Sequence, residues 1–402
     1  MALMPVADAL NAVLAGVEPL AEELVTLDAA YHRVLAHDLS SRRTQPPEPM
    51  SAMDGYAVQA ASAVAGARLR VIGEVAAGRP FTQIAGPGDA IRIFTGGVIP
   101  GGTDAVVIQE DTTRDGDIVI INEAALPDRN IRPAGVDFRE GDVLLRAGQR
   151  LSDRDLSLAA GMNYPKIAVW RRPRVALLAT GDELVMPGQT PGPGQIVYSN
   201  GYALRALARA EGAEVIDLGI AADTIDATTD GIRRARDAGA DVLITTGGAS
   251  VGDHDLVQQS LHSEGVDMAF WKIAMRPGKP MMSGRLGDMR VIGLPGNPVS
   301  SYVCALLFLS PLIRALSGRN DIHHTFGNGV LGRDLAANDQ RADYLRAVLT
   351  TSDDGTVVAT PVTRQDSSLL GNLAAAHALV IRAPFAPAAH AGEPCRFIQL
   401  PV

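Results

Sequence analysis

The spacing of hydrophobic and polar residues changes several times along the chain. Between residues 171 and 316, short apolar runs alternate with segments whose apolar residues recur at helical spacing. The expected strands are Val175–Ala179, Glu214–Leu218, Val242–Thr246, Met268–Ile273 and Arg290–Leu294, and the expected helices are Asn200–Glu211, Thr224–Ala238, His254–Ser263 and Val299–Leu316. This alternation is typical of a mostly parallel sheet with helices on both faces. We therefore predict a central three-layer α/β domain at 171–316.

The first 170 residues follow a different pattern. Residues 1–40 are helical in pattern, most clearly at Val6–Leu14, and the three prolines of Thr44-Gln-Pro-Pro-Glu-Pro49 then end regular structure. Short strand-like runs separated by Gly, Asp and Pro turns predict a β-rich domain up to residue 137. Ser152-Asp-Arg-Asp155 is a helix-start signal, with a hydroxyl cap and acidic residues in the first turn. Residues 138–170 are therefore predicted to have mixed secondary structure.

After Gly318 the strand pattern returns. The expected strands are Tyr344–Thr350, Thr356–Pro361, Ala378–Arg382 and Cys395–Leu400. These runs predict a small carboxy-terminal β-domain. The whole chain is therefore expected to be a multidomain α/β protein.

Composition and charge exclude several classes of function. The chain has 402 residues, 47% of them hydrophobic, and a formal net charge of −9. An acidic chain argues against a nucleic-acid binder that works through a broad basic surface, and against a membrane-surface role. The longest apolar run, Val299–Leu316, is interrupted by Ser310-Pro311 and carries Arg314, so no membrane span is expected. The amino terminus lacks a signal-peptide pattern, and we expect a cytoplasmic protein.

One local concentration of positive charge stands out against this acidic background. Two of the three lysines lie in Lys272-Ile-Ala-Met-Arg-Pro-Gly-Lys279, where the proline and glycine constrain the loop that carries the cations. Glycine-rich turns precede and follow it, at Thr245–Gly252 and Leu294–Ser300. Cations beside turns that expose backbone N–H groups favour an anionic, phosphate-bearing ligand. A solvated charge face and ligand-free tight turns are the alternatives.

These motifs follow predicted strands, and ligands of parallel sheets bind beyond the carboxyl ends of the strands. Asp223, Asp253 and Asp255 are expected at the same edge. Paired carboxylates beside phosphates suit Mg²⁺, although aspartates at helix starts are often merely solvated. Gly278-Lys279 precedes Pro280, so there is no Walker A loop, and neither HExxH nor GxSxG occurs. Composition alone assigns no function to Asp54-Gly55, to the turn at Thr95 or to Asp137. The pair Asp-Gly by itself favours a hairpin turn.

Seven strings together resemble a known family. SAMDGYA, IRIFTGGVIP, NIRPAGVDF, ATGDEL, TTGGASVGDHD, FWKIAMRPGKP and LPGNPVSS occur in the order seen in molybdopterin molybdenumtransferases, the MoeA proteins, which are similar to the E domain of gephyrin. The resemblance covers essentially the whole chain. It implies insertion of molybdenum from molybdate into adenylylated molybdopterin, with release of AMP and assistance from Mg²⁺. Molybdate and adenylylated molybdopterin would be substrates.

The resemblance also implies an elongated homodimer of four-domain chains. A mixed stem domain would comprise 1–40 and 138–170, a β-rich insert domain 41–137, a molybdopterin-binding α/β domain 171–316, and a β-barrel-like domain 317–402. The active cleft would lie between the α/β domain of one subunit and the insert of the other. Partners would include molybdopterin adenylyltransferase or other proteins of molybdenum cofactor biosynthesis, with no nucleic acid and no membrane.

Site residues carried over by motif fall into three groups. The pterin site would be lined by Thr180, Asp182, Glu183, Asp223, Gly247, Gly248, Ser250 and Asp255. Phosphate or molybdate would be held by Lys272, Arg276, Lys279, Asn297, Ser300, Arg346 and Ser367. Catalytic residues would be Asp54, Thr95, Asp137 and Asp255, and Asp223 and Asp255 would hold the metal. One departure is Arg276, where relatives commonly have lysine: the charge is kept, as a planar fork instead of a point charge.

Two other functions remain open at this point. A non-catalytic scaffold of the gephyrin kind need not keep Asp182, Asp255, Lys272, Lys279 and Ser300, all of which are present. A molybdopterin adenylyltransferase would need only one α/β domain of about 150 residues. The flanking domains argue against that second alternative.

Overall fold

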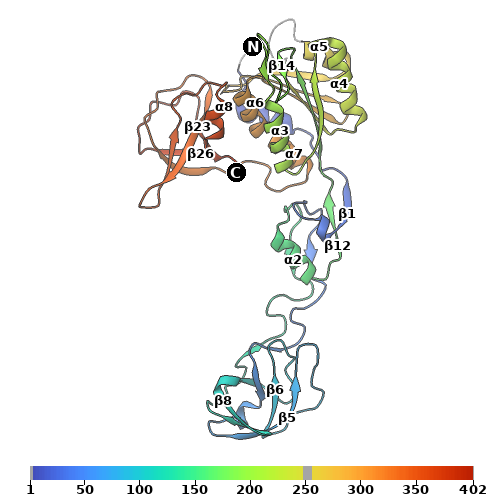
Figure 1. Cartoon of the computed structure of the whole chain (residues 1–402), viewed down its shortest axis with the longest axis vertical. Helices are drawn as coiled ribbons and strands as arrows, with labels where there is room; N and C mark the ends of the chain where they lie inside the picture. The colour runs from blue at the N-terminus through green and yellow to red at the C-terminus, as the bar shows by residue number, and fades with distance from the viewer. Residues whose placement is uncertain (1–2, 248–255, 402) are drawn as a thin grey trace.

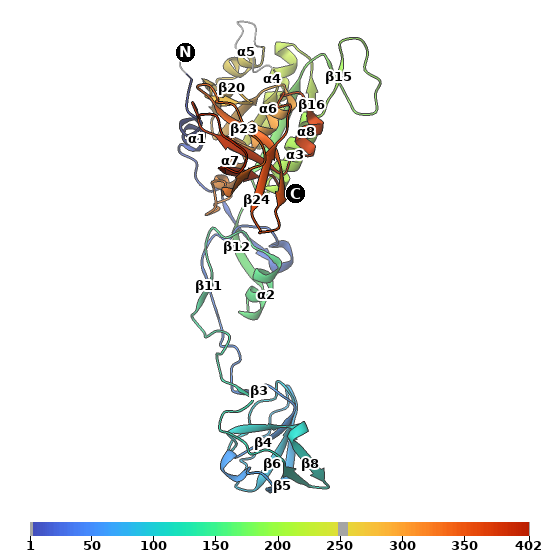
Figure 2. The same cartoon turned by 90° about the vertical axis from the view of Figure 1, so that its left-hand side faces the viewer.

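The computed structural model describes residues 3–247 and 256–401. The chain is elongated: the α/β domain and the carboxy-terminal β-domain lie together at one end, the insert lies at the other, and the stem lies between them (Figure 1). A quarter turn shows the same separation (Figure 2). The multidomain α/β fold predicted from the sequence is confirmed.

A six-stranded sheet forms the centre of the α/β domain. Its order is β16 (Glu214–Ala221), β13 (Arg174–Thr180), β17 (Val242–Thr246), β21 (Met289–Leu294), β20 (Pro280–Leu286) and β18 (Asp267–Lys272). The first four strands are parallel, and β20 and β18 continue the sheet in antiparallel pairing. Strand β20 was not predicted, because it contains a proline and a glycine, which are uncommon in strands. Its pairing with the neighbouring strand β21 stabilises it.

Helices cover both faces of this sheet. They are α3 (Asn200–Ala210), α4 (Ile225–Asp237), α5 (Leu256–Ser263) and the continuous run α6 (Pro298–Cys304), η4 (Ala305–Leu309) and α7 (Ser310–Leu316). In β13, Val175 and Leu177 pack with α3, α6 and α7, whereas Ala176 and Leu178 pack with α4 and α5. Alternate residues of a strand point to opposite faces, so both faces of β13 are apolar and buried. The predicted three layers are confirmed.

The long helix formed by α6, η4 and α7 is a core element. Its 19 residues are apolar enough to cross a membrane, with a mean hydropathy of 1.7, but 89% of the most apolar stretch is buried inside the protein. The segment η4, directly before Ser310-Pro311, is π-helical. Proline has no N–H for the helical ladder, and a wider turn accommodates it without ending the helix.

The amino-terminal segment divides between two domains. Only α1 (Val6–Leu14) is α-helical among residues 3–40, and its Ala9 and Val13 are buried in the core of the α/β domain. Farther along, β1 (Glu22–Thr26) pairs antiparallel with β12 (Lys166–Trp170) in the stem. The helical pattern predicted for 1–40 is therefore wrong beyond residue 14. A local pattern did not reveal a strand whose partner lies more than a hundred residues away.

The stem packs α2 (Asp153–Gly161) against these strands. Ser152 caps the helix: its Oγ accepts from the Asp155 N–H, and the Asp155 carboxylate accepts from the Ser152 N–H at 2.7 Å. This reciprocal pair satisfies backbone donors that a helix start leaves free. The helix start predicted at Ser152 is confirmed.

Two further sheets form the insert and the carboxy-terminal domain. The insert sheet has the order β7 (Ala105–Ile108), β4 (Gly55–Val58), β6 (Asp89–Ile93), β5 (Arg68–Val75), β9 (Ile118–Ile121) and β8 (Thr112–Asp115). The carboxy-terminal sheet has the order β23 (Ala342–Thr351), β24 (Val357–Pro361), β22 (Gly327–Leu331), β26 (Pro394–Gln399) and β25 (Ala378–Arg382), and β25 pairs back with β23. That last pairing closes a five-stranded barrel, so the predicted barrel-like domain is confirmed. Strand β22 was not predicted.

Candidate functional site

A cavity of about 530 Å³ opens at the carboxyl ends of β13, β17 and β21. Its lining residues come from strand ends, the segment of the short paired strands β14 (Leu184–Val185) and β15 (Ile196–Val197), and two helix starts. They are Thr180, Glu183, Leu184, Ile196, Val197, Tyr198, Ser199, Asn200, Thr246, Gly247, Pro280, Pro295, Gly296, Asn297, Pro298 and Ser300. The residues Thr180, Glu183, Gly247, Asn297 and Ser300 were predicted as site residues. The structure brings these five together at the sheet edge where parallel strands place ligands.

Two glycine turns approach each other at the floor of the cavity. Gly247 has a φ of +94°, and a Cβ there would lie 2.5 Å from the Thr180 carbonyl oxygen. A Cβ at Gly296 would lie 3.9 Å from the Gly247 Cα. A side chain at 247 would therefore be strained and would clash, so glycine lets three strand ends meet closely.

Two helices begin at the cavity wall. Asn200 starts α3, Pro298 starts α6, and the Asn200 amide donates to the Gly296 carbonyl at 2.7 Å, which ties the two starts together. Helix starts present free N–H groups and partial positive charge, which favours an anion. Tyr198, Ser199 and Asn200 were missed as site residues. The signal was present, because Ser199 immediately precedes the predicted helix that begins at Asn200, after a strand-like pair.

Two aspartates, Asp182 and Asp223, lie just beyond the ends of β13 and β16. The Asp182 N–H donates to the Asp223 carboxylate at 3.2 Å, and the Asp223 N–H donates to the Asp182 carboxylate at 3.1 Å. Each exposed aspartate keeps one oxygen outside this reciprocal pair. Within the described residues, no group of three or more His, Cys, Asp or Glu side chains forms a ready metal site. If Asp223 binds a hard cation such as Mg²⁺, it would do so through the carboxylate oxygen that does not accept from the Asp182 N–H.

The two site lysines flank the cavity from neighbouring strands. Lys272 ends β18 and pairs in register with Pro280, which lines the cavity, and Lys279 directly precedes Pro280. The Ile273 N–H donates to the Lys279 carbonyl at 2.8 Å, so the loop closes on itself. Over 3–247 and 256–401, neither ammonium has an ion-pair partner.

Arg276 is placed differently from the lysines. Its guanidinium donates to both carboxylate oxygens of Asp343, at 2.9 and 2.7 Å, and Asp343 belongs to β23 of the barrel. The carboxylate raises the pKa of Arg276, which keeps the side chain charged. Like Lys272 and Lys279, Arg276 is not among the residues that line the cavity.

Arg346 and Ser367 lie where the barrel meets the second glycine turn. Arg346 is fully buried; it donates to the Gln365 side-chain oxygen at 3.1 Å and to the Asp366 carbonyl at 2.8 Å. Its Nη2 has no hydrogen-bond partner among the described residues. The Ser367 Oγ accepts from the Asn297 amide at 3.2 Å. Ser367 therefore touches the cavity wall, whereas Arg346 supports the segment that carries Ser367.

The predicted residues of the insert are remote from the cavity of their own chain. Asp54 precedes β4 and Thr95 follows β6; the Asp54 carboxylate accepts from the Thr95 N–H at 2.7 Å and from its hydroxyl at 2.8 Å. These two hydrogen bonds lower the pKa of Asp54. Asp137 is exposed where the chain returns to the stem. The insert that carries this group is separated from the α/β domain by the stem (Figures 1 and 2).

The Asp54-Gly55 pair is a strand start and not a hairpin turn. A Cβ at Gly55 would lie 2.0 Å from the Val107 carbonyl oxygen, so the neighbouring strand β7 requires glycine there. Three other predicted site residues, Gly248, Ser250 and Asp255, lie outside the described residues.

The sequence matches three family models along nearly its whole length. They are the MoeA N-terminal region (domain I and II) at residues 4–162, a probable molybdopterin binding domain at 176–315, and the MoeA C-terminal region (domain IV) at 328–400. A molybdopterin molybdenumtransferase of Haemophilus influenzae is 39% identical over 302 residues, which cover 75% of this chain and 74% of that protein. The chain belongs to the molybdopterin molybdenumtransferase family.

Other members of this family agree in sequence and in fold. The molybdopterin molybdenumtransferase of Bacillus subtilis is 34% identical over 368 residues, 89% of this chain and 85% of that protein. The crystal structure of a molybdopterin biosynthesis MoeA protein from Pyrococcus horikoshii has a TM-score of 0.83 at 29% identity and covers 99% of both chains. The recognition made from the seven motifs is confirmed.

Proposed function

We propose that this protein inserts molybdenum from molybdate into adenylylated molybdopterin and releases AMP. The observation that carries the proposal is the cavity at the strand ends, where two helix starts and two glycine turns meet and where the lining residue Pro280 is paired with Lys272 and directly preceded by Lys279. Each of these groups favours a phosphate-bearing anion. Family membership supplies the identity of that anion, because the relatives are named for this reaction.

The chemical difficulty is the approach of like charges. Molybdate is a dianion, and the phosphates of the pterin nucleotide add further negative charge. Lys272, Lys279 and the helix starts would lower this repulsion and hold the phosphoanhydride in place for cleavage. Mg²⁺ would add a further positive charge, held by Asp223 together with Asp255. Asn297 and Ser300 would contact the phosphates from the α6 start.

The insert residues require a second copy of the chain. Because Asp54, Thr95 and Asp137 lie far from the cavity of their own chain, we propose a homodimer in which one insert reaches the other subunit's cavity. Because the Thr95 hydrogen bonds lower the pKa of Asp54, its carboxylate stays ionised to a lower pH than an ordinary aspartate does. An ionised carboxylate can orient a reacting oxygen. Cytoplasmic location and contact with the adenylyltransferase of the same pathway are further expectations of this proposal.

The test is molybdenum insertion by a Lys279→Ala variant. Lys279 is exposed, and the bound ligand would bury its charge contact. Removal of one partner of a buried charge contact costs about 2–5 kcal/mol, or roughly thirtyfold to several thousandfold in affinity. Purified variant would be supplied with molybdate, Mg²⁺ and adenylylated molybdopterin, with AMP release and cofactor formation as the readouts. Lys166→Ala is the matched control, because Lys166 is the remaining lysine and lies exposed in the stem.

Near-normal insertion by folded Lys279→Ala would contradict the assignment of the cavity. The two alternative functions are not favoured, because relatives that align over most of this chain are named as the transferase. AMP transfer from ATP to molybdopterin without molybdate would reverse that preference.

A further inference from the structure

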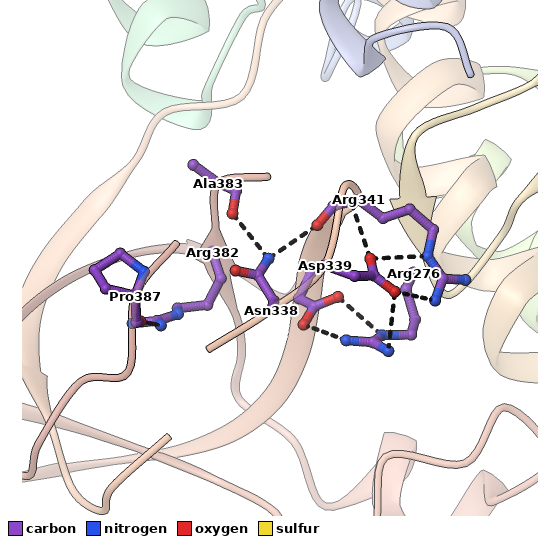
Figure 3. Close-up of polar contacts among 8 residues, drawn as sticks. Arg276, Asn338, Asp339, Arg341, Arg382, Ala383 and Pro387 are labelled. Carbon is purple, nitrogen blue, oxygen red and sulfur yellow. Dashed lines mark hydrogen bonds and ion pairs between the residues drawn. The ribbon is translucent and has the colours of Figure 1, made fainter. Parts of the chain in front are cut away.

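The loop that carries Lys279 is fastened to the barrel by an ion pair. Arg276 and Asp343 are 67 residues apart, and their two hydrogen bonds form the forked geometry of an arginine–carboxylate pair. The Asp343 side chain is only 7% exposed. In Figure 3 a dashed line joins Arg276 to the Asp339 carboxylate, which also forms an ion pair with Arg341 at 2.6 Å. The Arg276 guanidinium also lies 3.9 Å from the Asp339 carboxylate.

Backbone pairing reinforces this contact. Strand β19 (Met275–Arg276) pairs in parallel with the start of β23, with Arg276 opposite Asp343, and the Ala342 N–H donates to the Ala274 carbonyl at 2.8 Å. On the other side of the loop, a Cβ at Gly278 would lie 2.5 Å from the Cys304 Sγ. The loop is therefore held between the barrel and α6, with little space to shift.

The same barrel strand also supports the second cavity turn. Arg346, three residues after Asp343, binds the Asp366 carbonyl and thereby holds the segment that contains Ser367. The Ser367 carbonyl accepts from the Val299 N–H at 3.1 Å, and its hydroxyl accepts from Asn297. Strand β23 thus contacts the cationic loop directly through Asp343, and it supports the α6 start indirectly, because Arg346 holds the segment whose Ser367 contacts that start.

We propose that Arg276 and Asp343 are positioning residues that fix the Lys272–Lys279 loop to strand β23, so that Arg276 acts through Asp343 and not by touching the phosphate. If the Arg276 side chain moved away from Asp343 to contact a ligand, the nearly buried Asp343 carboxylate would lose the partner of its ion pair, which is strongly unfavourable. The inference rests on the proposed function, because it assigns these residues a part in anion binding at that cavity.

The test compares single variants, their combination and a charge swap. Arg276→Gln and Asp343→Asn should each raise KM for adenylylated molybdopterin roughly two- to thirtyfold and leave kcat nearly unchanged. The double variant should lose no more than either single variant, because both remove the same contact. The exchange Arg276→Asp with Asp343→Arg should recover part of the loss. Arg171→Gln is the matched control, since Arg171 makes a similar forked pair with Asp241 away from the cavity.

A direct role for Arg276 in ligand binding predicts a different result. In that case Asp343→Asn would free the guanidinium and leave KM unchanged or lower, while Arg276→Gln alone would raise it. That asymmetry would overturn the proposal, as would equal losses in the Arg171→Gln control.

Hydrogen exchange separates this inference from the proposed reaction. Amides of residues 273–279 should exchange faster in Arg276→Gln and in Asp343→Asn than in the wild-type protein, with or without substrate. Unchanged exchange in both variants would refute the proposal that the Arg276–Asp343 pair fixes the loop to strand β23. If wild-type protein transfers no molybdenum but the exchange result holds, the proposed function fails and the structural role of the pair stands.

Discussion

Gly247 is the residue on which the shape of the cavity floor depends most directly. Its positive φ is one that L side chains rarely adopt, and the Thr180 carbonyl occupies the place of a Cβ. The same carbonyl ends β13, so a shift there would move Thr180 and Gly181 together. Local backbone geometry and the shape of the binding cavity are therefore coupled at this position.

Gly247→Ala is expected to destabilise the protein and to abolish substrate binding. The left-handed conformation costs an alanine about 1–2 kcal/mol, and the close contact with Thr180 adds to that cost. Gly188→Ala is the control, because Gly188 has a φ of +93° but no neighbouring atom within 4 Å of its Cβ position. Urea unfolding should show a larger loss for Gly247→Ala; equal losses would show that the contact is relieved without cost.

At the scale of elements, α2 shows how a helix start fixes the stem. The capping box of Ser152 and Asp155 satisfies backbone donors at the start of the helix. The helix then buries Ala159 in the stem core with Leu151 and Met162. The stem sets the distance between the insert and the rest of the chain, so its stability bears on function.

Ser152→Ala is expected to cost about 0.5–2 kcal/mol of unfolding free energy, because the cap hydrogen bond to the Asp155 N–H is lost. Ser157→Ala, at an exposed position within the same helix, should be neutral or slightly stabilising, since alanine is the better helix former. Thermal and urea denaturation would measure both. A cost at residue 157 as large as that at 152 would contradict the capping assignment.

At the scale of the whole molecule, the separation of the insert from the cavity is the feature with the largest consequence. In a symmetric dimer, a subunit with an Asp54→Asn lesion and a subunit with a Lys279→Ala lesion would together contain one cavity free of both changes. That arrangement follows only if the two residues meet across the subunit interface.

Mixing Asp54→Asn and Lys279→Ala subunits, with exchange between dimers, is expected to restore activity to about a quarter of the wild-type value. Neither variant alone should show this activity. A mixture of Lys272→Ala with Lys279→Ala is the control, because both residues belong to the same loop beside the cavity and every heterodimer site would carry one substitution. Absence of recovery in the first mixture, with dimers shown to exchange, would contradict a shared site.

The pattern of the sequence determined the strand–helix alternation of the α/β domain, the helix start at Ser152 and the sheet edge at which the cavity opens. These features could be predicted because periodicity, capping and turn chemistry act between residues close in sequence. The family and its reaction were accessible from seven motifs in a fixed order. The cavity residues Gly247, Asn297 and Ser300 were recognised for the same reason.

Only the tertiary structure decided which residues meet across large sequence separations. It placed α1 on the α/β core, added β20 to the central sheet, closed the barrel between β23 and β25, and paired Arg276 with Asp343. From sequence alone, Arg276 was one more cation beside a glycine turn. Its partner depends on how two domains pack, and no local pattern records that packing, because such contacts are stabilised by surfaces that come together only in the folded chain.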